Sequence, residues 1–190
     1  MSWFRRAAAP SAADLLRGAW RCARCGQMHK GMIDLAAFAP DPWEGGHLRE
    51  ENAALHLDGD FLSEDFCVID GRYFFVRSVL EIPVHGFSAP FGFGCWSTLS
   101  RENFEKYVDG FDEGDFADWG PWTGWLSNQL FDYIGMKPEG VWVYPQANRQ
   151  RPKLIIHDPT HPLAADQANG VTPEHVLAIF EHYGHSPEGK

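Results

Sequence analysis

Runs of apolar residues with strand character are clearest in the middle of the chain. Residues 66–69 and 72–82 are rich in β-branched and aromatic side chains, and the Asp70-Gly71 dipeptide between them favours a type I′ turn. Residues 91–99, in which glycines alternate with large side chains, are expected to form a further strand with a bulge or a close backbone approach. The pattern therefore predicts a β-hairpin followed by a third strand.

The apolar spacing changes from that of a strand to that of a helix after Leu99. Ser100 can cap a helix in which large apolar side chains recur at positions 104, 107, 108 and 111. Two more strands are expected over 140–145 and 151–157. Two helices, started by Pro162 and Pro173, are expected to follow. The elements predict an α+β fold, with an antiparallel, aromatic-rich sheet flanked by helices.

Three tryptophans, Trp119, Trp122 and Trp125, lie close together between the predicted helix and the strand over 140–145. Three indoles so near one another can line a binding groove. A sheet of this kind also needs large side chains to cover its faces, so we expect core or hairpin packing for them.

A single domain is expected. Residues 1–19 are interpreted as a leader and a short helix that starts with the capping-box pattern Ser11 to Asp14, and residues 20–184 as one α+β domain. Residues 185–190 are expected to be a frayed tail. A chain of this length can bury a proper core without disulfides.

Composition and charge limit the classes of partner that the protein can bind. The chain has 190 residues and a formal net charge of −10, which disfavours nucleic acid because such binding needs clustered Lys and Arg. No apolar run approaches the roughly 20 residues of a membrane span, and residues 3–6 do not lead into the apolar segment of a secretory signal. We therefore expect a cytoplasmic protein with reduced thiols and with a protein or small-molecule partner, not a membrane.

One stretch combines residue types and spacing that specify a chemistry. Cys22 and Cys25 are separated by two residues and can chelate one ion, and Gly26 permits the positive φ with which such a loop turns beneath a metal. His29 offers a nitrogen four residues further on. The stretch predicts an N-terminal Cys/His knuckle that binds structural zinc.

A tetrahedral zinc needs a fourth ligand from elsewhere in the chain. Cys67 is the first candidate, followed by His161 or His157. Two other interpretations of the cysteines stay open. They can be reduced thiols that fill core positions, or Cys22 and Cys25 can form a redox pair whose thiolate is favoured by the flanking arginines at 21 and 24.

The sequence favours a non-catalytic cytosolic binding or interaction protein with a structural zinc site, because no nucleophile elbow, Walker loop or dinucleotide fingerprint occurs. The alternative is a metal-dependent hydrolase with an open zinc site, at the knuckle or at His157, Asp158 and His161. For those three residues the competing interpretation is that Asp158 and His161 satisfy backbone groups where a helix begins.

A long series of short motifs follows the same order as in a known family. The series is Cys22-x-x-Cys25-Gly26-x-x-His29, Ala39-Pro40 with Trp43, Asp65-x-Cys67-Val68-Ile69-Asp70-Gly71, Phe74-Phe75-Val76-Arg77, Glu81-Ile82-Pro83-Val84, Gly94-x-Trp96 with Leu99-Ser100, Arg151-Pro152, and His161-Pro162-Leu163-Ala164 with Gln167 and Gly170. Over about residues 20 to 180 the chain resembles a bacterial family catalogued as domain of unknown function number 2199. The resemblance implies no activity, because the family has none assigned. Cys95 stands where that pattern favours an aliphatic residue, so we do not expect it to be a ligand.

Overall fold

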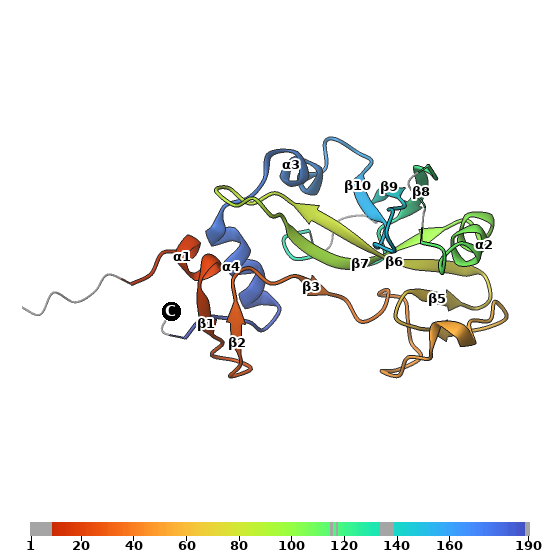
Figure 1. Ribbon diagram of the computed structural model, residues 1–190, viewed down its shortest axis with the longest axis horizontal. Coiled ribbons are helices and arrows are strands. Elements are labelled where there is room, and N and C mark those ends of the chain that lie inside the picture. The colour runs from red at the N-terminus through yellow and green to blue at the C-terminus, as the bar shows by residue number, and fades with distance from the viewer. Residues whose placement is uncertain (1–8, 115, 117, 134–138, 189–190) are drawn as a thin grey trace, which may run out of the picture.

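The computed structural model describes residues 9–114, 116, 118–133 and 139–188, which form a mixed α+β fold (Figure 1). The helices in this part of the chain are α1 (Ala12–Arg17), α2 (Arg101–Asp109), α3 (Pro162–Asn169) and α4 (Pro173–His182), with a short 3₁₀ helix at Asn52–Ala54. The strands are β1 (Ala19–Arg21), β2 (Met28–Lys30), β3 (Leu35–Ala36), β4 (Phe61–Leu62), β5 (Phe66–Ile69), β6 (Tyr73–Ile82), β7 (Phe91–Leu99), β8 (Trp122–Trp125), β9 (Gly140–Tyr144) and β10 (Lys153–Ile156). The expected α+β class is confirmed.

The long strands β6 and β7 form the centre of the main sheet. They pair antiparallel from Phe74 opposite Leu99 to Ile82 opposite Phe91. On its other side, β6 is shared, because β5 pairs with its first half and β10 runs parallel to its second half. The sheet follows the order β3-β7-β6-β10-β9-β8, with β4 added beside β5. Two of these pairings, β3 with β7 and β6 with β10, are parallel, so the sheet is mostly antiparallel.

The sheet curls back on itself beyond β8. The backbone N–H of Trp125 donates to Thr98 Oγ1 at 2.9 Å, and Leu126 forms an antiparallel bridge with Ser97 of β7. The next residue, Ser127, donates its N–H to the carbonyl of Trp96 at 2.8 Å. The path β7-β6-β10-β9-β8 therefore returns to β7.

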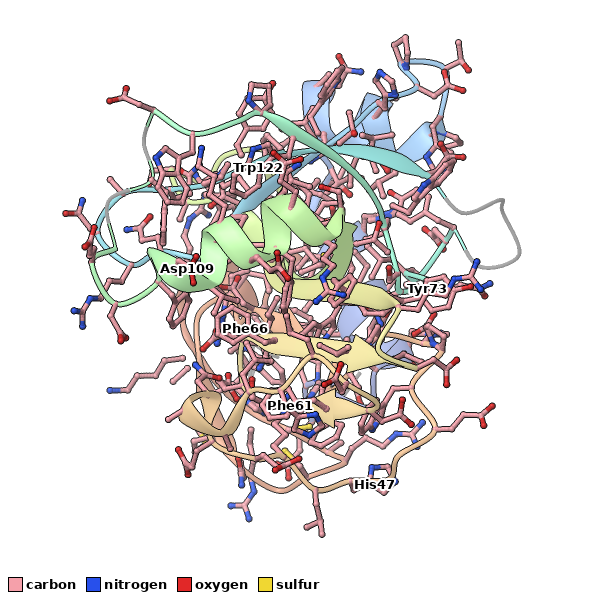
Figure 2. The ribbon with its side chains drawn as sticks, turned by 90° about the vertical axis from the view of Figure 1, so that its right-hand side faces the viewer. His47, Phe61, Phe66, Tyr73, Asp109 and Trp122 are labelled. Atoms are coloured by element: carbon pink, nitrogen blue, oxygen red, sulfur yellow. The ribbon has the colours of Figure 1, made fainter. Side chains whose placement is uncertain are left out.

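The turn and the helix start that the local sequence predicts are both present in the structure. Asp70 and Gly71 have φ values of 58° and 62°, and the N–H of Arg72 donates to the carbonyl of Ile69 at 3.0 Å, as in a type I′ turn. Ser100 caps α2 by accepting a hydrogen bond from the N–H three residues on. Figure 2 shows α2 lying across the strands, with Phe66 of β5 beneath it.

Side chains on the two faces of the sheet enter two separate apolar clusters. Alternate residues of β6, beginning with Phe74 and Val76, face the larger core, which also receives side chains from α2 and α4. Phe75 points to the opposite face, where it packs with Leu62, Cys67 and Trp96. Both faces of the central strands are therefore buried, which explains their nearly continuous apolar sequence.

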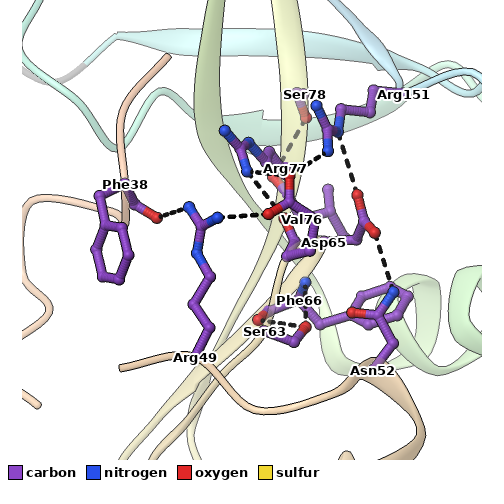
Figure 3. A network of polar contacts seen from close by, with 11 residues as sticks. Phe38, Arg49, Asn52, Ser63, Asp65, Phe66, Val76, Arg77, Ser78 and Arg151 are labelled. Carbon is purple, nitrogen blue, oxygen red and sulfur yellow. Dashed lines mark hydrogen bonds and ion pairs between the residues drawn. The ribbon is translucent and has the colours of Figure 1, made fainter. Parts of the chain in front are cut away.

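A charged network joins the start of β5, the middle of β6 and the segment before β10 (Figure 3). The carboxylate of Glu64 accepts from Arg49, Arg77 and Arg151, and Asp65 accepts from Arg151 at 3.1 Å. Arg77 is only 7% exposed, and burial, together with the charge of Arg151, lowers the pKa of its guanidinium. The carboxylates offset part of the cost of burying this charge.

The N-terminal hairpin and the C-terminal helix meet at one end of the molecule. Figure 1 shows α1, β1, β2 and α4 gathered there, with β5 and α2 at the opposite end. Trp20 of β1 is 3% exposed and stacks on Phe180 of α4, with ring centroids 6.0 Å apart. This contact attaches the hairpin to the larger core.

Candidate metal centre

The turn between β1 and β2 presents two sulfur atoms. The N–H of Cys25 points at the sulfur of Cys22, 3.5 Å away, and the N–H of Gly26 donates to the carbonyl of Cys22 at 3.0 Å. Gly26 has a φ of 69°, the left-handed conformation that a residue with a side chain rarely adopts. The positive φ that we expected at this glycine is confirmed.

His29 is directed to the same place by strand pairing. In the β1–β2 ladder Trp20 and His29 are opposite each other, so both side chains lie on one face of the hairpin. Their rings are 4.6 Å apart. Because Trp20 packs against α4, His29 faces the end of that helix.

The C-terminal end of α4 supplies a second imidazole, from His185. The N–H of His185 donates to the carbonyl of Phe180 at 2.7 Å, and that of Gly184 donates to Glu181 at 3.1 Å. Gly184 has a φ of 81°, so the helix ends in a Schellman motif that reverses the chain. The reversal brings the ring of His185 to 5.2 Å from that of His29.

The residues after His185 pair with the knuckle. Ala23 donates its N–H to the carbonyl of Ser186 at 2.7 Å, and Glu188 donates to the carbonyl of Arg21 at 2.9 Å. Between these bonds Cys22 and Pro187 form an antiparallel bridge. Among the described residues, 186–188 therefore pair with the hairpin along its edge, in the segment that we expected to be a frayed tail.

Four donor atoms converge as a result. Cys22, Cys25, His29 and His185 each place one sulfur or nitrogen within 4.8 Å of all the others. Cys25 Sγ lies 3.5 Å from His29 Nε2, and Cys22 Sγ lies 4.0 Å from His185 Nδ1. Tetrahedral zinc with bonds of about 2.0–2.3 Å holds its donors roughly 3.3–3.8 Å apart, so the set needs only small inward shifts. Two thiolates and two imidazoles are also a donor set that zinc favours.

The surroundings of Cys22 favour its thiolate form. Burial raises the pKa of this thiol. The backbone N–H groups of Cys25, Arg24 and Ser186, with a contribution from the Cys25 side chain, together lower it by more, so that the pKa is about 5. The N–H groups belong to the tight turn and to the returning tail. The fold is therefore arranged for a negative sulfur at this position.

The structure does not bring Cys67 to this group. Cys67 is fully buried among apolar side chains of the sheet, and burial, with the nearby Asp60 carboxylate, raises the pKa of its thiol to about 12. A neutral thiol in such a place behaves as a small apolar side chain. In place of the fourth donor that we expected from Cys67, the group contains His185, a residue of the expected tail. The one local signal for it is the glycine that precedes it, which permits the chain reversal.

The histidines considered as further ligands also lie outside the group. His161 caps α3, its Nδ1 accepting from the N–H of Leu163 at 3.2 Å. Asp158 accepts from the N–H of Thr160 at 2.8 Å. These contacts confirm that both side chains satisfy backbone N–H groups, and of the two only His161 caps the helix. Among the described residues, only the cluster with Cys22 gathers three or more potential metal ligands of the types Cys, His, Asp and Glu, and it does not include His157.

The family of the chain follows from a sequence comparison. A family model described as "Uncharacterized protein conserved in bacteria (DUF2199)" matches residues 21–171. The chain belongs to this family. The DUF2199 match includes three of the four converging donors, Cys22, Cys25 and His29, and ends before His185. Neither the curated proteins nor the solved structures that were compared contain a match. No helix in the described parts of this DUF2199 protein is long and apolar enough to cross a membrane.

Proposed function

We propose that this DUF2199 protein is a non-catalytic binding or interaction protein of the cytoplasm whose Cys22, Cys25, His29 and His185 hold one structural zinc ion. The observation that carries the proposal is the convergence of four donors within 4.8 Å. Structural zinc sites have four protein ligands, whereas catalytic sites keep one position for water or substrate. A filled donor set has no such position.

The work of the ion in this proposal is to hold two distant segments together. Three donors belong to the hairpin near the start of the chain, and His185 belongs to the segment that leaves α4. The hairpin strands have only three residues each, and such a short ribbon is not stable by itself. A shared ion adds to the contact that Trp20 makes with α4.

The compartment and partner class are also parts of this proposal. None of the four cysteines, all of which lie in the described parts of the chain, forms a disulfide, which agrees with a reducing compartment. The net charge of −10 favours a basic or neutral protein, or a small molecule, over nucleic acid.

A metal-dependent hydrolase is the second candidate, and one observation favours it. His29 and His185 line a cavity of about 610 Å³, together with Asp34 and Tyr183. In that case one of the four donors would have to leave the ion so that water could bind and attack a substrate.

Native mass spectrometry with elemental analysis tests the proposed ligand set. Protein purified without chelators is expected to carry one zinc per chain, and His185→Ala is expected to lose it. His182→Ala is the matched control, because His182 lies three residues earlier and outside the donor group. Zinc-free wild-type protein, or full zinc occupancy in His185→Ala, would contradict the proposal.

Cobalt substitution separates the structural from the catalytic candidate. Co²⁺ in a site with four protein ligands is expected to keep its tetrahedral visible spectrum when azide is added. A spectrum that changes with azide at saturating concentration would show an exchangeable position and would favour the hydrolase.

A further inference from the structure

A cavity of about 650 Å³ lies next to the cavity that His29 and His185 line, and shares Asp41, Asn128, Gln129 and Leu130 with it. Its buried residues are mainly apolar and include Phe75, Leu130 and Leu163, each no more than 4% exposed. Exposed aromatic rings stand at its mouth, since Tyr73 is 47% exposed and Trp125 is 58% exposed. Tyr73 is seen at the surface in Figure 2. The size and the lining are those of a small-molecule site.

The charged residues around this cavity carry one sign. Five carboxylates line it, from Asp41, Glu44, Asp60, Asp70 and Glu139, and no lysine or arginine does so among the described residues. Carboxylates beside the faces of aromatic rings attract organic cations. Charge complementarity therefore favours a positively charged ligand.

A pair of polar groups lies within this lining. His161 is 8% exposed, and its Nδ1 accepts from the N–H of Leu163, so the neutral ring carries its proton on Nε2. That Nε2 has no hydrogen-bond partner in the described chain. The carboxylate of Glu139 is 3.7 Å from it, too far for a good hydrogen bond. A buried donor without a partner is unfavourable, and a ligand atom can satisfy it.

The geometry points to a small primary amine with an apolar body and a hydrogen-bond acceptor next to its ammonium group as the ligand of this cavity. The ammonium donates to Glu139, the acceptor accepts a hydrogen bond from the Nε2–H of His161, and the body packs against Phe75 and the rings of Tyr73 and Trp125. This assignment deepens the proposed binding role, and it does not depend on the metal centre.

Phenylalaninol is a suitable probe, because it combines an ammonium group, a neighbouring hydroxyl and an aromatic body. We expect its titration into the zinc-loaded full chain to shift the indole N–H signals of Trp43 and Trp125, which line the cavity, and not that of Trp20. Phenylpropanol lacks the ammonium group and is expected to bind at least about tenfold more weakly. Phenethylamine lacks the hydroxyl and is expected to lie between the two.

Two conservative variants test the named groups. Glu139→Gln removes the charge and is expected to weaken phenylalaninol at least about tenfold while it leaves the affinity for phenylpropanol unchanged. His161→Asn keeps a side-chain acceptor that can cap α3 but loses the Nε2 donor, so phenylalaninol should weaken to the affinity of phenethylamine. Glu181→Gln is the control, because it removes an exposed carboxylate outside the lining. A thermal melt of each variant shows whether it is folded.

Three outcomes would overturn the inference. They are no shift of Trp43 or Trp125 at millimolar phenylalaninol, equal binding of phenylalaninol and phenylpropanol, and equal binding by wild type and Glu139→Gln. Zinc content is measured on the same samples. A zinc-free protein that still binds phenylalaninol would contradict the metal proposal alone, and a zinc-loaded protein that binds no amine would contradict the amine site alone.

Discussion

A cysteine at the metal centre and a cysteine in the central sheet have pKa values shifted in opposite directions. Cys22, in the turn after β1, is buried but faces three backbone N–H groups, and its pKa is lowered to about 5. Cys67, in β5, is equally buried among apolar side chains, and its pKa is raised to about 12. Burial alone therefore does not decide the state of a cysteine. The protonation state depends on whether backbone N–H groups are free to bond the sulfur. They are free in a tight turn, whereas those of a strand already donate to the neighbouring strand.

The two regions also differ in what holds them together. The sheet buries large side chains on both faces. The hairpin β1–β2 has one large buried anchor, Trp20, and gains the rest of its order from the tail and, in our account, from an ion. We therefore expect changes in the sheet to alter global stability, and changes at the knuckle to act locally.

The largest expected effect comes from the core of the sheet. Phe91→Ala removes a fully buried ring that packs against Phe93 and Phe180, and it should lower the free energy of unfolding by about 3–5 kcal/mol. Chemical denaturation measures this change. Ile155→Ala, at a side chain 45% exposed, is the control and should change stability far less. Equal losses for the two variants would contradict the assignment of stability to the sheet core.

A smaller effect is expected from the charged network. Glu64→Gln removes a carboxylate shared by three arginines and leaves the buried Arg77 less compensated, which should cost about 2 kcal/mol. Glu105→Gln breaks only the exposed pair with Arg101 and should cost about 0.5 kcal/mol or less. Arg77→Met in the Glu64→Gln background should recover part of the loss. A double variant less stable than Glu64→Gln would show that we have misjudged the penalty of the unpaired charge.

Chelation should act on one region only. Removal of the ion is expected to abolish hydrogen-exchange protection in the hairpin and in residues 184–188, while β6 and β7 keep theirs and the melt of the sheet shifts less than in Glu64→Gln. Hydrogen exchange with mass spectrometry resolves the two regions. If chelation removed the whole cooperative transition, the division between the two ends of the molecule would be refuted.

The smallest effect is expected at the buried cysteine of the sheet. Cys67→Val replaces one small apolar side chain with another, so zinc content should stay at one per chain and stability at neutral pH should change by less than about 1.5 kcal/mol. Loss of zinc in this variant would show that Cys67 is a zinc ligand and would contradict our ligand set.

The pH dependence of the same variant sharpens the comparison. The folded state keeps the Cys67 proton up to a pKa of about 12, whereas the unfolded chain releases it near the ordinary value of 9.0. Because the unfolded state then binds fewer protons, this thiol lowers stability as pH rises from about 9 towards 12. Cys67→Val should therefore lose less stability than wild type between pH 9 and 11. Parallel loss in both proteins would show that the thiol does not have a raised pKa.

Much of the fold could be predicted because its signals are local. The turn at Asp70-Gly71, the cap at Ser100 and the proline starts of α3 and α4 each depend on neighbouring residues, and each forms as expected. The return of Leu126 to β7 and the parallel pairings of β3 and β10 join segments that are far apart in sequence. Periodicity carries no information about such partners.

The candidate site also contains residues that local sequence predicts and one residue that only distant contacts bring in. Cys22, Cys25 and His29 are within eight residues, and their donor atoms come together as the spacing with the following glycine predicts. That they bind zinc stays a proposal. His185 is 163 residues from Cys22, so only the packing of α4 on the hairpin brings the two together. Cys67 was the more attractive candidate by residue type. Because side chains alternate in direction along β5, that of Cys67 points into an apolar cluster of the sheet. The tryptophans were expected in core or hairpin packing, and Trp125 instead stands exposed at the mouth of a cavity.

Zinc X-ray absorption spectroscopy tests the central claim most directly, because it counts the sulfur and nitrogen atoms bound to the ion. Our account predicts two sulfur atoms at about 2.3 Å and two imidazole nitrogens at about 2.0–2.1 Å. A third sulfur would restore a cysteine of the sheet as a ligand. An oxygen in place of a nitrogen would mean an open position, and either result would contradict a closed site made by Cys22, Cys25, His29 and His185.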